Sequence, residues 1–177
     1  MKIVILQGSP NVSGSTAMLV DNFMSGAQKV GHECKRVDVD KLDFEPCTGC
    51  VACGYEGPCS QSDDFDDLRE LILASDMVVF ATPLYYFGMT AQLKAVVDRF
   101  CSANASITAG RKKCALLAVA WNTQDWIYDA LVSHYKTFTR YLKMSDQGMI
   151  LGRGCGTPTQ TAGSDFPRKA YEFGKSL

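Results

Sequence analysis

The chain opens with a short apolar run that breaks at once into a loop of small, hydroxyl-bearing residues. Residues 3–6 are apolar, and residues 8–16 are mostly glycine, serine and threonine before a helical pattern begins. A buried strand that leads into such a loop at a helix start is typical of a phosphate site. Backbone N–H groups, hydroxyls and the partial positive charge of the helix N-terminus all attract an anion there. The pattern predicts an α/β fold whose first turn binds phosphate.

The loop disfavours two common kinds of nucleotide site. No lysine stands where a P-loop needs one, and the glycines do not follow the G-x-G-x-x-G spacing of dinucleotide-binding turns. The several hydroxyls favour a monophosphate held by neutral donors over an ordinary turn capped by one Ser or Thr. The candidate phosphate ligands are Ser9, Asn11, Ser13, Gly14, Ser15 and Thr16.

Composition bounds the class of protein. The 177 residues are 46% apolar and 21% charged, which fits one soluble globular domain spanning residues 1–177. The net charge is −1 and no basic run exceeds residues 111–113, so we expect neither a nucleic-acid nor a membrane partner. Eight cysteines without a signal peptide indicate thiol, metal or redox chemistry in a reducing compartment, and predict a cytoplasmic protein.

Apolar runs alternate with helical patterns along the chain. The predicted strands are residues 3–6, 33–39, 77–81, 114–120 and 148–151. Residues 77–81 show no polar alternation, which is typical of a parallel strand covered on both faces. Strands alternating with helices predict a doubly wound α/β fold, a five-stranded parallel sheet in the order 2-1-3-4-5. Its ligand would lie beyond the carboxyl ends of the first and third strands.

Apolar spacing also predicts the faces of the helices. Gly31 is predicted to end the first helix and Pro167 to open the last one. Ser62 and Asp63 are the candidate caps of the second. The predicted buried faces are Leu19, Phe23, Ala27 and Val30; Phe65, Leu68 and Ile72; Leu93, Val96, Val97 and Phe100; Leu131, Tyr135, Phe138 and Leu142; and Ala170 with Phe173.

A second loop follows the third predicted strand and adjoins the first one in this topology. Pro83 would rigidify it and Gly88 would let a ligand approach the backbone. Taken by itself, this loop fits an aromatic cluster that caps the core. Next to a loop that binds phosphate, the interpretation of a flavin-binding loop is favoured. Trp121 and Asn122 follow strand four at the same edge, where a buried Trp is an equal alternative. The candidate ring contacts are Thr82, Pro83, Leu84, Tyr85, Tyr86, Phe87, Gly88, Trp121 and Asn122.

A cysteine-rich loop spans about residues 42–61. Four of its thiols are separated by two, two and five residues: Cys47, Cys50, Cys53 and Cys59. C-x₂-C-x₂-C spacing can wrap one iron–sulfur cube, so a 4Fe–4S cluster is one interpretation. Structural zinc is a second, although this spacing crowds a tetrahedral ion. A loop of reduced thiols without metal is the third.

The remaining cysteines and the histidines form no motif. Cys34, Cys101 and Cys114 are predicted to lie in the core, and Cys155 to be an accessible thiol. The glycine-rich residues 152–156 have no helix predicted directly after them, so they carry little weight as a nucleotide motif. His32 and His134 have no predicted nucleophile beside them. We therefore predict no catalytic side chain.

These motifs together resemble the NAD(P)H-dependent FMN reductase family of flavodoxin-like proteins, close to its iron–sulfur flavoprotein branch. The resemblance rests on residues 8–16, the segment Pro46–Cys53, Asp63-Asp64 before a helix, and residues 82–94 with Asp98-Arg99. It implies that the first loop binds FMN phosphate and that residues 83–88 hold the isoalloxazine. Asn11 stands where many relatives carry Arg, so one charged phosphate contact is expected to be missing.

The resemblance implies an FMN-dependent oxidoreductase that takes hydride from NAD(P)H and passes electrons to a small-molecule or redox-protein acceptor. FMN carries the chemistry in such enzymes, so no side-chain base is needed. The alternatives are an electron carrier of the flavodoxin or iron–sulfur kind without its own substrate, and a redox-sensing cysteine module. Homodimers or homotetramers are expected, because residues 42–61 and the aromatic residues 85–87 would expose apolar surface on a monomer. The resemblance also implies that subunits meet near the flavin.

Overall fold

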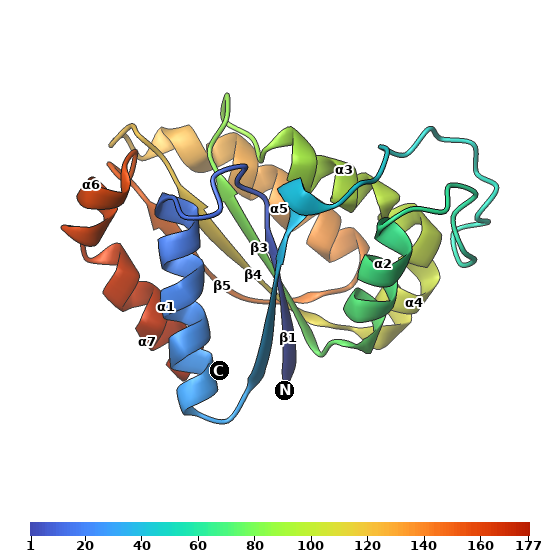
Figure 1. Ribbon diagram of the computed structural model, residues 1–177, viewed down its shortest axis with the longest axis horizontal. Helices are drawn as coiled ribbons and strands as arrows, with labels where there is room; N and C mark the ends of the chain where they lie inside the picture. Colours follow the sequence, from blue (N-terminus) through green and yellow to red (C-terminus); the bar gives the residue numbers. More distant parts are fainter.

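The computed structural model describes all 177 residues and contains the predicted sheet. Five parallel strands lie in the order β2-β1-β3-β4-β5 (Figure 1). Their bounds are β1 (Lys2–Gln7), β2 (Glu33–Asp38), β3 (Met77–Pro83), β4 (Lys113–Val119) and β5 (Ser145–Gly152). The order reverses between β1 and β3, so the loops after these two strands meet at one edge of the sheet, as the sequence predicts.

Helices cover both faces of the sheet. One layer contains α1 (Ser15–Lys29), α6 (Pro158–Ala162) and α7 (Phe166–Lys175). The other contains α2 (Phe65–Ala74), α3 (Ala91–Arg99), α4 (Asn104–Gly110) and α5 (Asp129–Tyr141). Short 3₁₀ helices are η1 (Val39–Lys41), η2 (Phe100–Ala103) and η3 (Trp126–Tyr128). None of the helices is long and apolar enough to cross a membrane.

Alternate side chains of the strands pack into two separate hydrophobic cores. Along β3, Val78 and Phe80 pack toward α2–α5, whereas Met77, Val79 and Ala81 pack toward α1 and α7. All five are fully buried, which explains why this strand shows no polar alternation.

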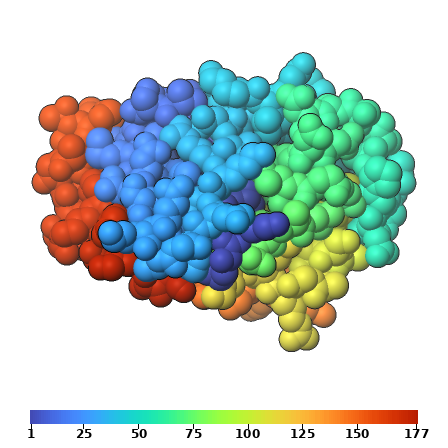
Figure 2. All heavy atoms as spheres, turned by 60° about the horizontal axis from the view of Figure 1, so that its bottom comes forward, coloured from blue at the N-terminus to red at the C-terminus, as the bar shows by residue number.

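α1 and α7 approach each other closely through two glycines. A Cβ on Gly26 would lie 2.0 Å from the carbonyl oxygen of Tyr171, and one on Gly174 would lie 2.1 Å from that of Phe23. In Figure 2 the C-terminal segment lies against α1 for this reason.

The structure corrects two sequence predictions about helices. Val30 was assigned to the buried face of the first helix, but it is the C-cap and is 45% exposed. Gly31 does end this helix, with φ +88°. The glycine-rich residues 152–156 are followed almost directly by α6, which Thr157 starts with a capping box to Gln160. The prediction that no helix follows this segment is therefore wrong, and with it the reason for giving the segment little weight.

Candidate functional site

A cavity of about 260 Å³ lies at the carboxyl ends of β1, β3 and β4, at the edge of the sheet where the sequence predicts the ligand. Four loops contribute to it: those after β1, β3, β4 and β5. The lining residues are Ser9, Asn11, Gly14, Ser15, Thr16, Pro83, Leu84, Tyr85, Val119, Ala120, Trp121, Cys155, Gly156 and Pro158. In Figure 1 these loops gather above the sheet.

The structure brings nine of the fifteen predicted cofactor residues to this cavity and leaves six outside its lining. Those outside are Ser13, Thr82, Tyr86, Phe87, Gly88 and Asn122. Thr82 is completely buried and joins the two ends of its loop, accepting a hydrogen bond from Thr90 N–H and donating one to Pro83 O. Its role in this structure is to shape the loop.

The start of α1 presents unpaired donors to the cavity. Gly14 is the N-cap, no side chain caps the helix, and the first intrahelical bond runs from Met18 N–H to Gly14 O. The N–H groups of Ser15 and Thr16 therefore have no protein acceptor. The Ser15 hydroxyl is buried and also lacks a hydrogen-bond partner. Unsatisfied buried polar groups are costly, so this cluster of donors fits an anion better than it fits an empty turn.

Contacts behind the loop hold it in shape. Gly8 N–H donates to Ala81 O on β3, and the Thr90 hydroxyl donates to Gly8 O over 2.6 Å. A Cβ on Gly8 would lie 2.6 Å from that of Leu93, so this position needs glycine for the close approach of β1 to α3. Arg36 on β2 donates to the Val12 carbonyl from outside the cavity. The loop between β1 and α1 is thus fixed by contacts to β2, β3 and α3 in the absence of a ligand.

The loop after β3 forms a tight turn. Tyr85 and Gly88 exchange backbone hydrogen bonds, and Tyr86 and Phe87 between them have φ +44° and +66°. Positive φ strains non-glycine residues. Leu84 N–H is committed to Val119 O, so this amide is not free to bind a ring. Phe87 instead stacks against Trp126, with ring centroids 5.3 Å apart.

Trp121 packs on a glycine that the sequence analysis did not assign to the site. A Cβ on Gly156 would lie 2.1 Å from the Trp121 ring, so the indole lies directly on this backbone. The lining residues missed by the sequence analysis are Val119, Ala120, Cys155, Gly156 and Pro158. The glycine-rich residues 152–156 were the available signal. Cys155 was predicted to be an accessible thiol, but it is 1% exposed and forms part of the cavity wall.

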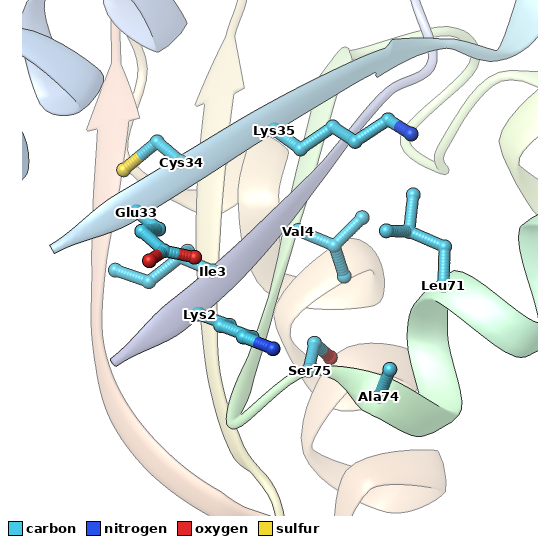
Figure 3. Close-up of a pocket in the computed structure, with 9 residues that line it drawn as sticks. All are labelled: Lys2, Ile3, Val4, Glu33, Cys34, Lys35, Leu71, Ala74 and Ser75. Atoms are coloured by element: carbon cyan, nitrogen blue, oxygen red, sulfur yellow. The ribbon is translucent and has the colours of Figure 1, made fainter.

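A larger cavity, about 340 Å³, lies at the opposite end of the sheet (Figure 3). It is formed by the starts of β1 and β2 and the end of α2, and includes Lys2, Glu33 and Leu71. Open α/β sheets bind ligands at the carboxyl ends of their strands, and this cavity lies at the amino ends. It is therefore a weaker candidate than the smaller cavity.

The cysteine loop lines a separate cavity of about 170 Å³. Cys47, Cys50, Cys53 and Cys59 all contribute to it, but nowhere in the chain do three His, Cys, Asp or Glu side chains come together in a group that could hold a metal ion. The thiols as positioned therefore do not fit a 4Fe–4S cluster or zinc. Cys101, predicted to be a core residue, is only half-buried and lines the same cavity.

The fold and the cavity define a flavodoxin-like protein with a cavity at the topological switch point. The family model of the NADPH-dependent FMN reductases matches residues 1–148. The chain therefore belongs to the NADPH-dependent FMN reductase family, whose members are oxidoreductases that use FMN and NAD(P)H.

Individual relatives agree with this assignment. An iron–sulfur flavoprotein of Archaeoglobus fulgidus is 37% identical over 99 residues, covering 56% of this chain and 45% of the relative. One from Methanosarcina thermophila is 32% identical over 116 residues, covering 66% and 58%. The chain thus spans about half the length of these curated relatives. An NAD(P)H:quinone oxidoreductase from Methanothermobacter marburgensis has the same fold, with TM-score 0.80, 18% identity and coverage of 100% and 96%.

Proposed function

We propose that this protein is an FMN-dependent oxidoreductase that takes hydride from NAD(P)H and passes electrons to a small-molecule or protein acceptor. The observation that carries the proposal is the buried, unpartnered hydroxyl of Ser15 at the uncapped N-terminus of α1. This group needs an acceptor, and the phosphate of FMN supplies one. Membership in the NADPH-dependent FMN reductase family supports the same cofactor.

Bound FMN would supply the ring that accepts hydride, and the chain supplies binding and orientation. Ser15, Thr16 and the first N–H groups of α1 hold the phosphate. Trp121, seated on Gly156, and the Pro83–Tyr85 segment border the rest of the cavity and would keep water from the ring. FMN chemistry of this kind needs no side-chain acid or base, and the ionisable side chains in the lining are Tyr85 and the buried Cys155.

Two measurements test the proposal. Mass spectrometry of cofactor released from the FMN-reconstituted protein should identify FMN, and release of FAD alone would contradict it. The reconstituted protein should then oxidise NADH or NADPH when a quinone or a one-electron acceptor is present, and comparing the two nucleotides reveals the preferred donor. Failure to oxidise either nucleotide, with FMN bound, would favour the alternative, an electron carrier without its own substrate.

A net charge of −1 argues against the carrier, because electron carriers of the flavodoxin kind are strongly acidic. A 4Fe–4S cluster is not part of this proposal, since the thiols do not form a metal-binding group. We further propose that the protein forms a homodimer or homotetramer through the exposed aromatic residues beside the cavity, which include Tyr86 at 100% exposure.

A further inference from the structure

Five thiols from two distant parts of the chain surround one cavity. Four belong to the cysteine loop, and the fifth, Cys101, lies on η2. Cys101 lines the same cavity of about 170 Å³ as Cys47 and Cys53, so few ångströms of open space separate it from the loop thiols. Both Cys47 and Cys101 are only partly buried, so small solutes reach them. The pair is separated by 54 residues in sequence.

Arg99 brings the two thiols together. The Arg99 guanidinium donates a hydrogen bond of 2.7 Å to the carbonyl of Glu45, which lies two residues before Cys47. Arg99 itself lies two residues before Cys101. It also donates to Gln61 O, at the far end of the cysteine loop. The Arg99 side chain is fully buried, and Arg99 is one of the residues that line the cavity. Its Nε has no hydrogen-bond partner. One side chain therefore fixes both ends of the loop against the segment that carries Cys101.

The middle of the loop is also fixed to the same side of the fold. Ala105 N–H donates to Tyr55 O over 3.2 Å. Arg69 on α2 donates to Ser102 O, next to Cys101, and to Glu56 O within the loop. These contacts hold the cysteine loop and the Cys101 segment around one cavity, so a disulfide across it requires little backbone movement.

We propose that Cys47 and Cys101 form a reversible disulfide, and that the oxidant is a small-molecule disulfide of the glutathione type. The thiolate of Cys47 attacks one sulfur of the oxidant and releases one small thiol. Cys101, after losing its proton, attacks the protein sulfur of the mixed disulfide and releases the second small thiol. Two protein thiols are oxidised, one small disulfide is reduced to two thiols, and the two protons end on those thiols.

This disulfide would join the cysteine loop covalently to η2. The inference does not depend on FMN, because the flavin cavity and the thiol cavity share no lining residue. The thiol cavity would act as a redox-sensitive site of the protein, independent of the cofactor chemistry at the switch point.

The test uses the full-length, FMN-reconstituted protein equilibrated with oxidised and reduced glutathione. Remaining thiols are blocked with N-ethylmaleimide and counted by intact mass. The reduced protein should carry eight labels, and the oxidised protein six. Trypsin without reductant should then release peptide 42–69 linked to peptide 100–111, since the chain has Lys or Arg at positions 41, 69, 99 and 111. Fragmentation of the linked pair should place the bond at Cys47.

Variants supply the matched controls. Cys47→Ser and Cys101→Ser should lose the linked peptides, whereas Cys34→Ser, which changes a partly buried thiol outside the cavity, should keep them. The wild-type cross-link stands as evidence even if a variant folds poorly. Three results would overturn the proposal: a disulfide confined to peptide 42–69, glutathione adducts without a cross-link, or eight labels at every ratio of oxidised to reduced glutathione. So would protein isolated without oxygen that contains iron and sulfide and shields Cys47 from labelling.

Discussion

Arg99 and Asp63 form a two-point ion pair across 36 residues, with N···O distances of 2.9 and 3.0 Å. The Arg99 side chain is fully buried and that of Asp63 is 16% exposed. The guanidinium also lies over the Phe65 ring, 4.7 Å from its centroid. This pair attaches the C-terminal end of the cysteine loop to α3, which anchors a segment that has no helix or strand between η1 and α2.

Asp63→Asn should destabilise the protein by about 3 kcal/mol at pH 7, because it leaves the buried Arg99 charge without its counter-ion. Burial alone would raise the pKa of Asp63, but hydrogen bonds from Arg99 and from the backbone outweigh it and hold the pKa below its ordinary value. A lowered folded-state pKa stabilises the fold above the unfolded pKa of about 3.9, and this stabilisation is lost as the pH falls further.

Urea unfolding of the flavin-free protein at several pH values measures this effect. The free energies of unfolding of the wild type and of Asp63→Asn should differ most near neutral pH and become similar in acid. Asp165→Asn is the matched control, because Asp165 pairs with Arg168 at the surface, where both side chains are about two-thirds exposed. Asp165→Asn should change the free energy of unfolding by less than about 0.5 kcal/mol. A difference between wild type and Asp63→Asn that does not depend on pH would contradict the ion-pair explanation.

Replacing Ser15 and Thr16 together by alanine should weaken FMN binding by about 1–3 kcal/mol, because both residues are buried and line the cavity at the start of α1. Fluorescence titration of the apoprotein with FMN measures this as a Kd raised about 5- to 150-fold. Thr137→Ala, a hydroxyl change on the exposed side of α5, should leave the Kd unchanged. Equal affinity of the double variant and wild type would place the phosphate elsewhere.

The sheet order and most buried helix faces were predictable, because they depend on local patterns. Residues 77–81 lack polar alternation, and Leu19, Phe23 and Ala27 repeat at helical spacing; the structure buries all of them. The prediction that Val30 is buried is wrong because the helix ends one residue before it. Helix ends depend on backbone geometry more than on apolar spacing.

Site residues contributed by the β5–α6 segment were not predictable in the same way. Gly156 and Cys155 reach the cavity only because β5 lies next to β4, which is a long-range relationship. The same is true of Cys101, which shares a cavity with Cys47 because Arg99 holds the cysteine loop against the segment that carries Cys101. Cysteine spacing within the loop could not reveal a partner 54 residues away.

The exposed aromatic residues beside the flavin cavity predict self-association. Tyr85, Tyr86, Phe87 and Trp126 are between 43% and 100% exposed. Sedimentation velocity at micromolar concentration should therefore show a dimer or tetramer. Tyr86→Ser combined with Phe87→Ser should shift the protein toward monomer, because aromatic residues that act as interface hot spots contribute about 2 kcal/mol or more each. Tyr141→Ser changes an equally exposed aromatic residue far along α5 and should leave the assembly intact. A wild-type monomer would refute the prediction.

Gly156→Ala should weaken FMN binding without unfolding the protein. The new Cβ would lie 2.1 Å from the Trp121 ring, so the indole must move, and at 71% exposure it has solvent into which to move. Trp121 also lines the cavity, so its displacement removes a wall of the flavin site. We expect FMN affinity to fall about tenfold, which corresponds to about 1.4 kcal/mol, and the tryptophan emission to change.

Gly163→Ala is the matched control for this variant. Gly163 follows α6 with φ −78°, and a Cβ there would come no closer than 3.6 Å to any neighbour, so alanine fits without displacement. Its FMN affinity and emission should equal those of the wild type. Trp121→Ala should lower FMN affinity to the same extent as Gly156→Ala, and adding Gly156→Ala to it should cause little further loss, because the two changes act through one contact. Additive losses would show that Gly156 acts on the flavin independently of Trp121.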